Sequence, residues 1–200
     1  MKPVSQQPND VRSEVSLHLR EHLAVVSMLD SHLGDQIVVV SRLIAKALAK
    51  DNIIYWCGNG GSASDSQHLA AEFIGRFKNN RRPLASVALN TDTSVLTSVA
   101  NDFGYDQVFV RQVEALCRDG DVLIAISTSG NSRNVVEAVQ SATRRGVTTV
   151  GLLGATGGAL RDIVAYPLLV PSVSTARIQE SHILIGHVLC DLVERELGIA

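Results

Sequence analysis

Apolar positions in the first quarter of the chain recur at the spacing of a helix. A helix that ends near Leu33 is predicted by a set of such positions: Val11, Val15, Val25, Val26 and Leu29. Asn9 or Asp10 stands where an N-cap would lie, and we expect residues 1–8 to form a disordered tail. The Gly34-Asp35 pair predicts a break, after which a second helix runs to about Ala49.

Beyond residue 50 the pattern changes to short apolar runs separated by amphipathic stretches. The apolar runs predict five buried strands, at residues 53–57, 84–89, 121–126, 147–153 and 166–170. The stretches between them predict helices at 62–77, 93–100, 105–118 and 131–145, followed by a long final helix at 175–197. Strands that alternate with helices form a mostly parallel α/β sheet through right-handed crossovers. We therefore expect one domain over residues 9–200, with N-terminal helices at 9–50 and an α/β core at 51–200.

Composition narrows the class of protein. The chain has 200 residues, of which 46% are apolar, enough to form a core. Its 18 basic and 20 acidic residues give a net charge of −2, which carries no general electrostatic footprint for nucleic acid. Aromatic residues make up only 4%, which argues against platforms that stack single-stranded bases.

The sequence also indicates where the protein works. The N-terminus lacks the apolar core of a signal peptide, and no apolar run, Ile37–Val40 included, approaches the ~18 residues of a membrane span. Cys57, Cys117 and Cys190 are odd in number and widely spaced, which fits reduced thiols better than a disulfide framework. We expect a cytoplasmic protein that binds neither membrane nor nucleic acid.

The first candidate binding loop is CGNGGSASD at residues 57–65, directly after the first predicted strand. Its glycines permit a sharp turn and a close approach to a ligand. Ser62 and Asp65 have the spacing of a capping box, and the exposed amides of a helix start favour an anion. A glycine turn with only a structural role has the same pattern and stays open as an interpretation.

A dinucleotide-binding loop is a further interpretation of the same segment, because Gly58, Gly60 and Ala63 fit the pattern GxGxxA. That pattern calls for an acidic residue about 20 positions further on. The chain has Asn79, Asn80, Arg81 and Arg82 there. An arginine can accept the extra phosphate of NADP, so this interpretation is weakened but stays open.

The second candidate loop is ISTSGNS at residues 126–132, after the clearest predicted strand. It offers four hydroxyl groups, those of Ser127, Thr128, Ser129 and Ser132, and Gly130 permits a tight turn before the next helix. Hydroxyls at a helix start, without the lysine of a P-loop, suit a phosphate monoester and not a nucleoside triphosphate. Serine-rich turns are common, so the position between strand and helix is what favours phosphate binding.

Two pairs of side chains are candidates for chemistry. His68 and Glu72 lie four residues apart and share one helix face, a spacing that surface pairs also show. Gln179 and His187 lie eight apart on the last helix, which is about 12 Å of rise and about 80° of rotation. Two such residues are more easily brought to one site from different subunits. His182, close to the buried stripe of that helix, is interpreted as a packing residue.

Further polar residues have a weaker signal. Asn101 and Asp102 fit either an ordinary Asx turn or a polar clamp on substrate hydroxyls. His18 and His22 lie four apart near the apolar stripe of the first helix. Because we expect no carboxylate or loop motif to accompany them, we interpret both as packing or interface residues.

These features together resemble the sugar isomerase (SIS) fold and, more closely, the bacterial phosphoheptose isomerases. Four segments carry the resemblance: CGNGGSASDSQHLAAEF (57–73), TSVANDFGYD (97–106), GDVLIAISTSGNSRNV (120–135) and RIQESHILIGHVLCDLVE (177–194). The likeness spans most of the chain, including its helical N-terminus. The loops alone are moderately specific for the fold, and the two pairs of side chains make the isomerase resemblance more specific.

The resemblance implies an architecture and a reaction. The fold would be a five-stranded parallel sheet flanked by helices, assembled as a homotetramer with active sites between subunits. The reaction would convert the ketose D-sedoheptulose 7-phosphate to the aldose D-glycero-D-manno-heptose 7-phosphate, the first step of nucleotide-activated heptose biosynthesis. Such a conversion moves a proton between C1 and C2 through an enediol and needs a general acid and a general base.

The resemblance also implies roles for particular residues. Glu72 and His187 match the acid/base pair of the family. The positions that bind Zn²⁺ in the family are matched by His68, Glu72, Gln179 and His187. Phosphate would be held by Ser127, Thr128, Ser129 and Ser132, and the sugar would be lined by Asn59, Gly60, Gly61, Ser62, Asn101, Asp102 and Gln179. A divalent ion near the carbonyl would act as a Lewis acid.

Two non-enzymatic relatives of the fold stand as alternatives. A SIS scaffold that binds the replication initiator DnaA has a pattern without the acidic residue of the His–Glu pair and without the histidine of the last helix. Both positions, Glu72 and His187, are filled here. A regulatory module that senses sugar phosphates usually accompanies a DNA-binding domain, for which we expect no room in this chain.

Overall fold

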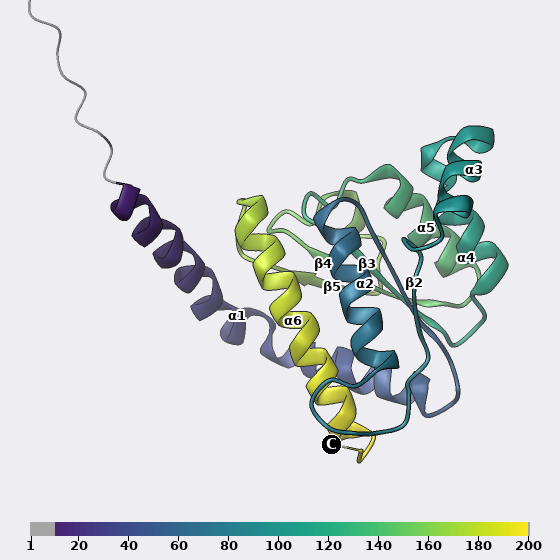
Figure 1. Ribbon diagram of the computed structural model, residues 1–200, viewed down its shortest axis with the longest axis horizontal. Helices are drawn as coiled ribbons and strands as arrows, with labels where there is room; N and C mark the ends of the chain where they lie inside the picture. Colours follow the sequence, from purple (N-terminus) through teal and green to yellow (C-terminus); the bar gives the residue numbers. More distant parts are fainter. Residues whose placement is uncertain (1–10, 200) are drawn as a thin grey trace, which may run out of the picture.

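The computed structural model describes residues 11–199, which fold around one five-stranded sheet (Figure 1). Neighbouring strands are all parallel, in the order β2-β1-β3-β4-β5. The strands are β1 (Ile54–Gly58), β2 (Ser86–Ala88), β3 (Val122–Ser127), β4 (Thr148–Leu153) and β5 (Tyr166–Leu169). The prediction of a five-stranded parallel sheet flanked by helices is confirmed, and each strand lies within or one residue beyond its predicted range.

Helices cover both faces of the sheet, as its buried central strands require. Every residue of β1 and β3 is buried, so neither face of these strands meets water. One face packs against α1 (Val11–Leu48), α2 (Gly61–Ile74) and α6 (Thr175–Glu196). The other packs against α3 (Thr93–Phe103), α4 (Val110–Leu116) and α5 (Arg133–Arg144). Single 3₁₀ turns occur at Tyr105–Gln107 and Gly158–Leu160.

The N-terminal part of the described chain is one helix of 38 residues, so the predicted break at Gly34-Asp35 is wrong. A buried stripe continues across Gly34 at helical spacing, formed by Val25, Leu29, Leu33, Ile37, Val40, Ile44 and Leu48. A glycine inside a helix costs only about 1 kcal/mol. Burying a single leucine or isoleucine contributes about 1.5–3 kcal/mol, so burial of the stripe keeps the helix continuous across Gly34. The predicted tail and the Asn9 or Asp10 cap lie outside the described residues.

The exposed half of α1 carries apolar residues that no other part of residues 11–199 covers. Val11 and Leu23 are 77% and 64% exposed, and Leu19 is 59% exposed. An 18-residue window of α1 has a mean hydropathy of 1.4, so the helix is long and apolar enough to cross a membrane by length and composition alone. The sequence interpretation, which counted uninterrupted apolar runs, did not predict this. Core helices of soluble proteins meet the same criterion, although only 28% of this window is buried.

Three predicted helices differ from the observed ones by three residues or more. The helix expected at 93–100 continues to Phe103. The helix expected at 105–118 is divided into a 3₁₀ turn and α4. The division falls at Val108 and Phe109, whose fully buried side chains enter the second core, so burial overrides helix continuity there. The helix expected at 62–77 ends at Ile74, followed by Gly75 as its C-cap.

Close packing between α2 and α6 fixes the geometry of the molecule around its candidate site. Gly61 lies beside Gln179, and Leu69 lies beside Gly186, so the two helices run in the same direction. A Cβ atom at Gly186 would lie 2.5 Å from both methyl groups of Leu69, which is fully buried. Glycine at position 186 is therefore what allows α6 to approach α2 this closely.

We predict that alanine at two helical glycines has different effects on stability. Gly34→Ala raises the free energy of unfolding by about 1 kcal/mol, because it gains helix propensity and its Cβ meets only the Asp30 side chain. Gly186→Ala gains the same propensity but overpacks Leu69, which costs about 1–3 kcal/mol. Urea unfolding measures both, and equal stabilisation by the two substitutions would contradict the close packing of α2 against α6.

Candidate active site

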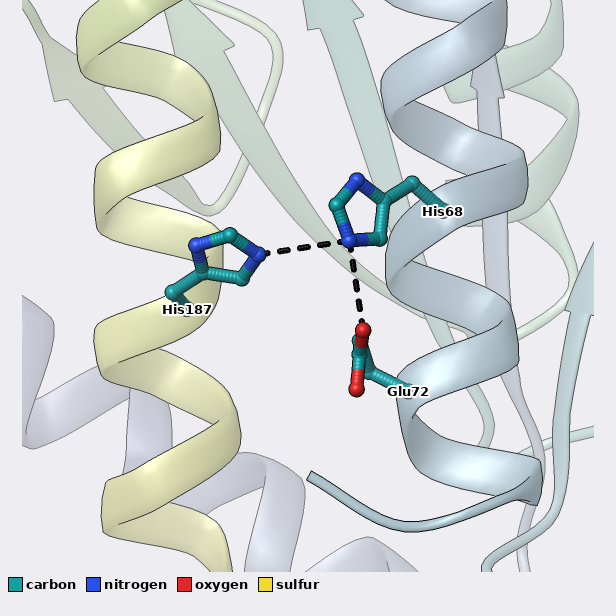
Figure 2. A group of neighbouring side chains, drawn as sticks. All are labelled: His68, Glu72 and His187. Atoms are coloured by element: carbon teal, nitrogen blue, oxygen red, sulfur yellow. Dashed lines mark hydrogen bonds and ion pairs between the residues drawn. The ribbon is translucent and has the colours of Figure 1, made fainter. Parts of the chain in front are cut away.

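Three side chains from two helices converge on one point (Figure 2). His68 and Glu72 project from successive turns of α2, with His68 Nε2 at 3.2 Å from Glu72 Oε1. His187 of α6 places its Nε2 at 3.4 Å from the same His68 nitrogen. The predicted His68/Glu72 pair is therefore part of a three-residue arrangement, here called the His–Glu–His group.

The His–Glu–His group has the chemistry of a divalent metal site. One ligand atom from each residue lies within 4.8 Å of the others. Imidazole nitrogens and a carboxylate oxygen form a donor set that suits Zn²⁺. The two facing imidazole nitrogens would repel each other through their lone pairs unless a proton or a cation lies between them. The residues present thus fit a bound zinc ion.

The surroundings of His187 favour its neutral form. Burial lowers the pKa of its ring, the neighbouring His68 lowers that pKa further, and Glu72 acts in the opposite direction. The ring of Phe77 stacks on that of His187, with centroids 5.4 Å apart. A neutral imidazole can bind a metal or accept a proton, so this environment suits either role.

Two other titratable residues of α6 are unsuited to the chemistry of the group. Burial raises the pKa of the Cys190 thiol, and the Glu72 and Glu194 carboxylates raise it further. The thiol stays protonated and does not supply a thiolate ligand. His182 is fully buried, and burial lowers its pKa to about 4, although the carbonyl of Leu153 favours the protonated ring. The prediction that His182 is a packing residue is confirmed.

The loop at residues 57–62, here called the glycine loop, brings β1 against the end of β3. A Cβ at Gly58 would lie 2.9 Å from the carbonyl oxygen of Ile126, and Gly60 has a φ of +55°. A Cβ at Gly61 would lie 2.6 Å from Nε2 of Gln179. Gln179 therefore contacts the glycine loop, about 12 Å along α6 from His187. Within one chain it does not join the His–Glu–His group.

The start of α2 differs from the predicted capping box. Gly60 is the N-cap, no side chain caps the helix, and Ser62 lies inside its first turn. The amides of Ser62 and Ala63 donate to the carbonyls of Asn59 and Gly60, each at 3.0 Å. Because the glycines allow so tight a turn, the loop backbone itself satisfies these amides, which are not free for an anion.

A reciprocal pair of amide side chains links the two candidate loops. Asn59 donates to Asn134 at 2.8 Å, and Asn134 donates back at 2.9 Å. The hydroxyl of Tyr105 also donates to the Asn59 side-chain oxygen, at 3.0 Å. These hydrogen bonds use both the nitrogen and the oxygen of the Asn59 side-chain amide, which was predicted to line the sugar. Sequence reasoning missed Asn134 and Tyr105, although both lie in segments that carry the family resemblance.

The loop at residues 127–132, here called the hydroxyl loop, turns sharply at the end of β3. The Ser127 and Ser132 hydroxyl oxygens lie 3.1 Å apart, and the Gly130 amide donates to Ser127 Oγ at 3.1 Å. Gly130 has a φ of +67°, and a Cβ there would overlap the carbonyl of Gly157. Only glycine fits this position, so the predicted tight turn is confirmed.

A polar cavity of about 330 Å³ opens beside the hydroxyl loop. Its lining consists of Thr128, Ser129, Asn131, Ala155, Thr156, Ser172, Val173, Thr175 and Ile178. Thr175 begins α6, so the positive end of a 22-residue helix faces a cavity at the carboxyl ends of β3 and β4. Sequence reasoning identified Thr128 and Ser129 but missed Thr156, Ser172 and Thr175, which follow the next two strands.

The remaining polar candidates lie apart from the His–Glu–His group. Asn101 and Asp102 are exposed near the end of α3, and the Asn101 amide donates to the Asp102 carboxylate at 2.8 Å. His22 pairs with Glu180 at 2.7 Å, and His18 lies 3.7 Å from Glu21. The expectation that no carboxylate accompanies these histidines is wrong, because Glu21 lies beside His18 on the same helix and Glu180 reaches His22 from α6.

Comparisons with known proteins agree with this geometry. The SIS domain family model matches residues 18–154. The phosphoheptose isomerase of Geobacter sulfurreducens is 53% identical over 184 residues, covering 92% of this chain and 97% of that protein. The phosphoheptose isomerase of Aquifex aeolicus is 55% identical over 161 residues, covering 80% and 84%.

Solved structures give the same result. Phosphoheptose isomerase GmhA from Neisseria gonorrhoeae is 44% identical, with a TM-score of 0.88 over 92% of this chain and 99% of that one. A phosphoheptose isomerase from Francisella tularensis is 31% identical, with a TM-score of 0.91 over 94% of this chain and all of that one. By sequence and by fold, the chain belongs to the phosphoheptose isomerases of the SIS domain family.

Proposed function

We propose that the protein interconverts D-sedoheptulose 7-phosphate and D-glycero-D-manno-heptose 7-phosphate, the first step of nucleotide-activated heptose biosynthesis. The observation that carries the proposal is the convergence of Glu72 and His187, from separate helices, on one nitrogen of His68. Family membership supplies the substrate class, and the His–Glu–His group supplies the two groups that the chemistry needs.

Isomerisation transfers a proton between C1 and C2 of the open-chain sugar through an enediol. A general base removes the proton from one carbon and a general acid supplies a proton at the other end of the carbon–oxygen system. Glu72 and His187 lie within 3.2 and 3.4 Å of His68 Nε2, so both reach the same small volume. Either residue can serve as the base, with the other as the acid.

We assign a zinc ion to the same group. His68, Glu72 and His187 would hold it, and its chemical contribution would be that of a Lewis acid toward the substrate oxygens. Gln179 is the fourth position that the resemblance assigns to zinc, and it contacts Gly61 instead. A zinc contact from Gln179 would have to come from a second copy of the chain, and within one chain we assign it to substrate binding.

The two loops would bind the substrate. Ser127, Thr128, Ser129 and Ser132 are assigned to the phosphate, because Thr128 and Ser129 line a polar cavity at the positive end of α6. The sugar is assigned to Asn59, Gly60, Gly61, Ser62, Asn101 and Asp102. Asn59 would contribute through its backbone and through the amide pair with Asn134.

We propose a homotetramer with active sites between subunits. Thr175 at the cavity and His187 are 187 − 175 = 12 residues apart, about 18 Å along α6, which is longer than an extended seven-carbon sugar phosphate. A loop of a partner subunit could bring the phosphate site closer to the His–Glu–His group. The exposed apolar residues of α1 are the surface such an assembly would bury. We further propose that residues 9–200 act as one domain, in the cytoplasm.

The alternative of a scaffold for DnaA receives no support from the relatives described above. Glu72 and His187, the positions that its pattern lacks, are here part of one compact group with His68. A surface that only binds a partner does not need an imidazole and a carboxylate to converge on the same atom. The catalytic interpretation accounts for that convergence directly.

We predict that Glu72→Gln abolishes most turnover of sedoheptulose 7-phosphate while the protein folds normally. Loss of a general acid or base lowers kcat by about 10²–10⁴-fold. Product formation is followed by a coupled assay for the heptose 7-phosphate, and Glu14→Gln, on an exposed turn of α1, serves as control. Full activity of Glu72→Gln would remove Glu72 from the mechanism, and no turnover by the folded wild type would refute the proposed substrate.

Metal removal is expected to lower turnover, with recovery on addition of Zn²⁺. After dialysis against a chelator, metal content is measured per chain and activity is assayed before and after zinc addition. His68→Gln is expected to bind zinc at least tenfold more weakly, because it removes one of three ligands. Unchanged activity in metal-free protein would assign catalysis to the side chains alone.

Assembly is expected to depend on the exposed apolar residues of α1. Leu19→Gln/Leu23→Gln shifts the protein toward smaller species in analytical ultracentrifugation, because it removes apolar area from a subunit contact. Arg20→Gln serves as the matched control, because it also introduces glutamine in these turns of α1 but removes no apolar side chain. A wild-type protein that sediments as a monomer would contradict the assembly outright.

A further inference from the structure

A buried ion pair joins α6 to the segment that follows α2. Arg81 Nε donates to Glu194 Oε1 at 2.8 Å, and the two side chains are only 3% and 1% exposed. Removing both charges from water is costly, and this cost is often not recovered by their attraction. A pair buried so completely therefore calls for a role beyond general stability.

The other donors of Arg81 bind the end of α2. Nη2 donates to the carbonyl of Glu72 at 2.8 Å, and Nη1 donates to the carbonyl of Phe73 at 2.8 Å. Nη1 also lies 3.3 Å from the carbonyl of Gly75. Carbonyls in the last turn of a helix lack partners within the helix and carry its negative end. One guanidinium thus fixes the backbone of Glu72 itself.

Glu194 connects the same pair to His187. The two residues are seven apart on α6, which is two turns, so they lie on the same side of the helix. Glu194 Oε1 also accepts a hydrogen bond from the amide of Phe77 at 3.3 Å. The ring of Phe77 in turn stacks on His187. The carboxylate therefore holds both Arg81 and the residue that packs against the His187 ring.

We propose that Arg81 and Glu194 are positioning residues for the isomerase reaction. Together they hold the C-terminal end of α2 against α6, so that Glu72 and His187 meet with fixed separation and Phe77 stays on the His187 ring. This inference rests on the proposed function. Neither residue touches the reacting atoms, and both act through the backbone of Glu72 and through Phe77.

Stability alone does not explain this choice of residues. Glu194 Oε2 is buried without a hydrogen-bond partner, so the pair is not fully satisfied. Buried ion pairs of this kind can often be replaced by apolar side chains of similar volume without loss of stability. Apolar side chains at 81 and 194 could fill the space, but they could not donate to the Glu72 carbonyl or accept from the Phe77 amide.

The test uses the full chain and removes both charges together. Arg81→Met/Glu194→Leu leaves no lone buried ion, so we expect it to fold. Its kcat is expected to fall at least tenfold, with KM changed less than twofold, because the loops assigned to substrate are untouched. The control is Arg42→Met/Glu196→Leu, which removes the exposed pair between α1 and α6 and leaves kcat unchanged.

A second readout is independent of turnover and is recorded on metal-free protein. In NMR spectra of protein labelled at histidine, the ring protons of His187 carry a ring-current shift from the stacked Phe77. The His187 signals are assigned by comparison with His187→Gln. The double variant is expected to lose this shift, and the control is expected to keep it. Arg81→Lys keeps the charge but lacks the several donors of the guanidinium, so we expect it too to lower kcat and to lose the ring-current shift. It replaces the double variant if that variant does not fold.

The outcomes separate this proposal from the proposed function. Lower kcat together with altered His187 signals supports positioning by Arg81 and Glu194. Wild-type kcat, or unaltered His187 signals, in the folded variants overturns it. If the wild type does not convert sedoheptulose 7-phosphate, the proposed function fails, and the His187 signals alone then decide whether Arg81 and Glu194 position this ring.

Discussion

The contact between Leu69 and Gly186 is the constraint on which the rest of the site depends. The missing side chain at Gly186 lets α6 lie directly against α2, and the fully buried Leu69 fills the space. Only at this separation does His187 reach His68, which is on the same helix as Leu69. Glycine weakens a helix by about 1 kcal/mol relative to alanine. Glycine at position 186 therefore lowers the stability of α6 itself but allows the two helices to approach.

Both ends of the α2–α6 contact are held by different means. At the amino-terminal end, Gln179 lies against Gly61, where no side chain intervenes. At the carboxyl-terminal end, Arg81 and Glu194 join the helices through a buried ion pair and several backbone hydrogen bonds. The His–Glu–His group lies between these two attachments. A contact between α2 and α6 that is held at both ends suits chemistry that needs an acid and a base at fixed separation.

Parts of the fold and site followed from local patterns. The five strands are short apolar runs, and the central strands β1 and β3 are buried on both faces, which makes them visible in the sequence. His68 and Glu72 share a face because helical geometry alone places residues four apart together. The tight turn at Gly130 was readable for a similar reason, since glycine is favoured where the backbone turns with a positive φ. Other local patterns misled: Gly34 did not end α1, and Ser62 did not cap α2.

What the sequence by itself determined was the parallel α/β sheet, the positions of its loops and the chemical types of the side chains that could act. Only the tertiary structure decided that His187 joins His68 and Glu72 while Gln179 contacts Gly61. It also decided that Arg81, in a loop, binds the carbonyl of Glu72. The physical reason is range: periodicity and turn preference act over a few residues, whereas helix contacts depend on side-chain volumes more than one hundred positions apart.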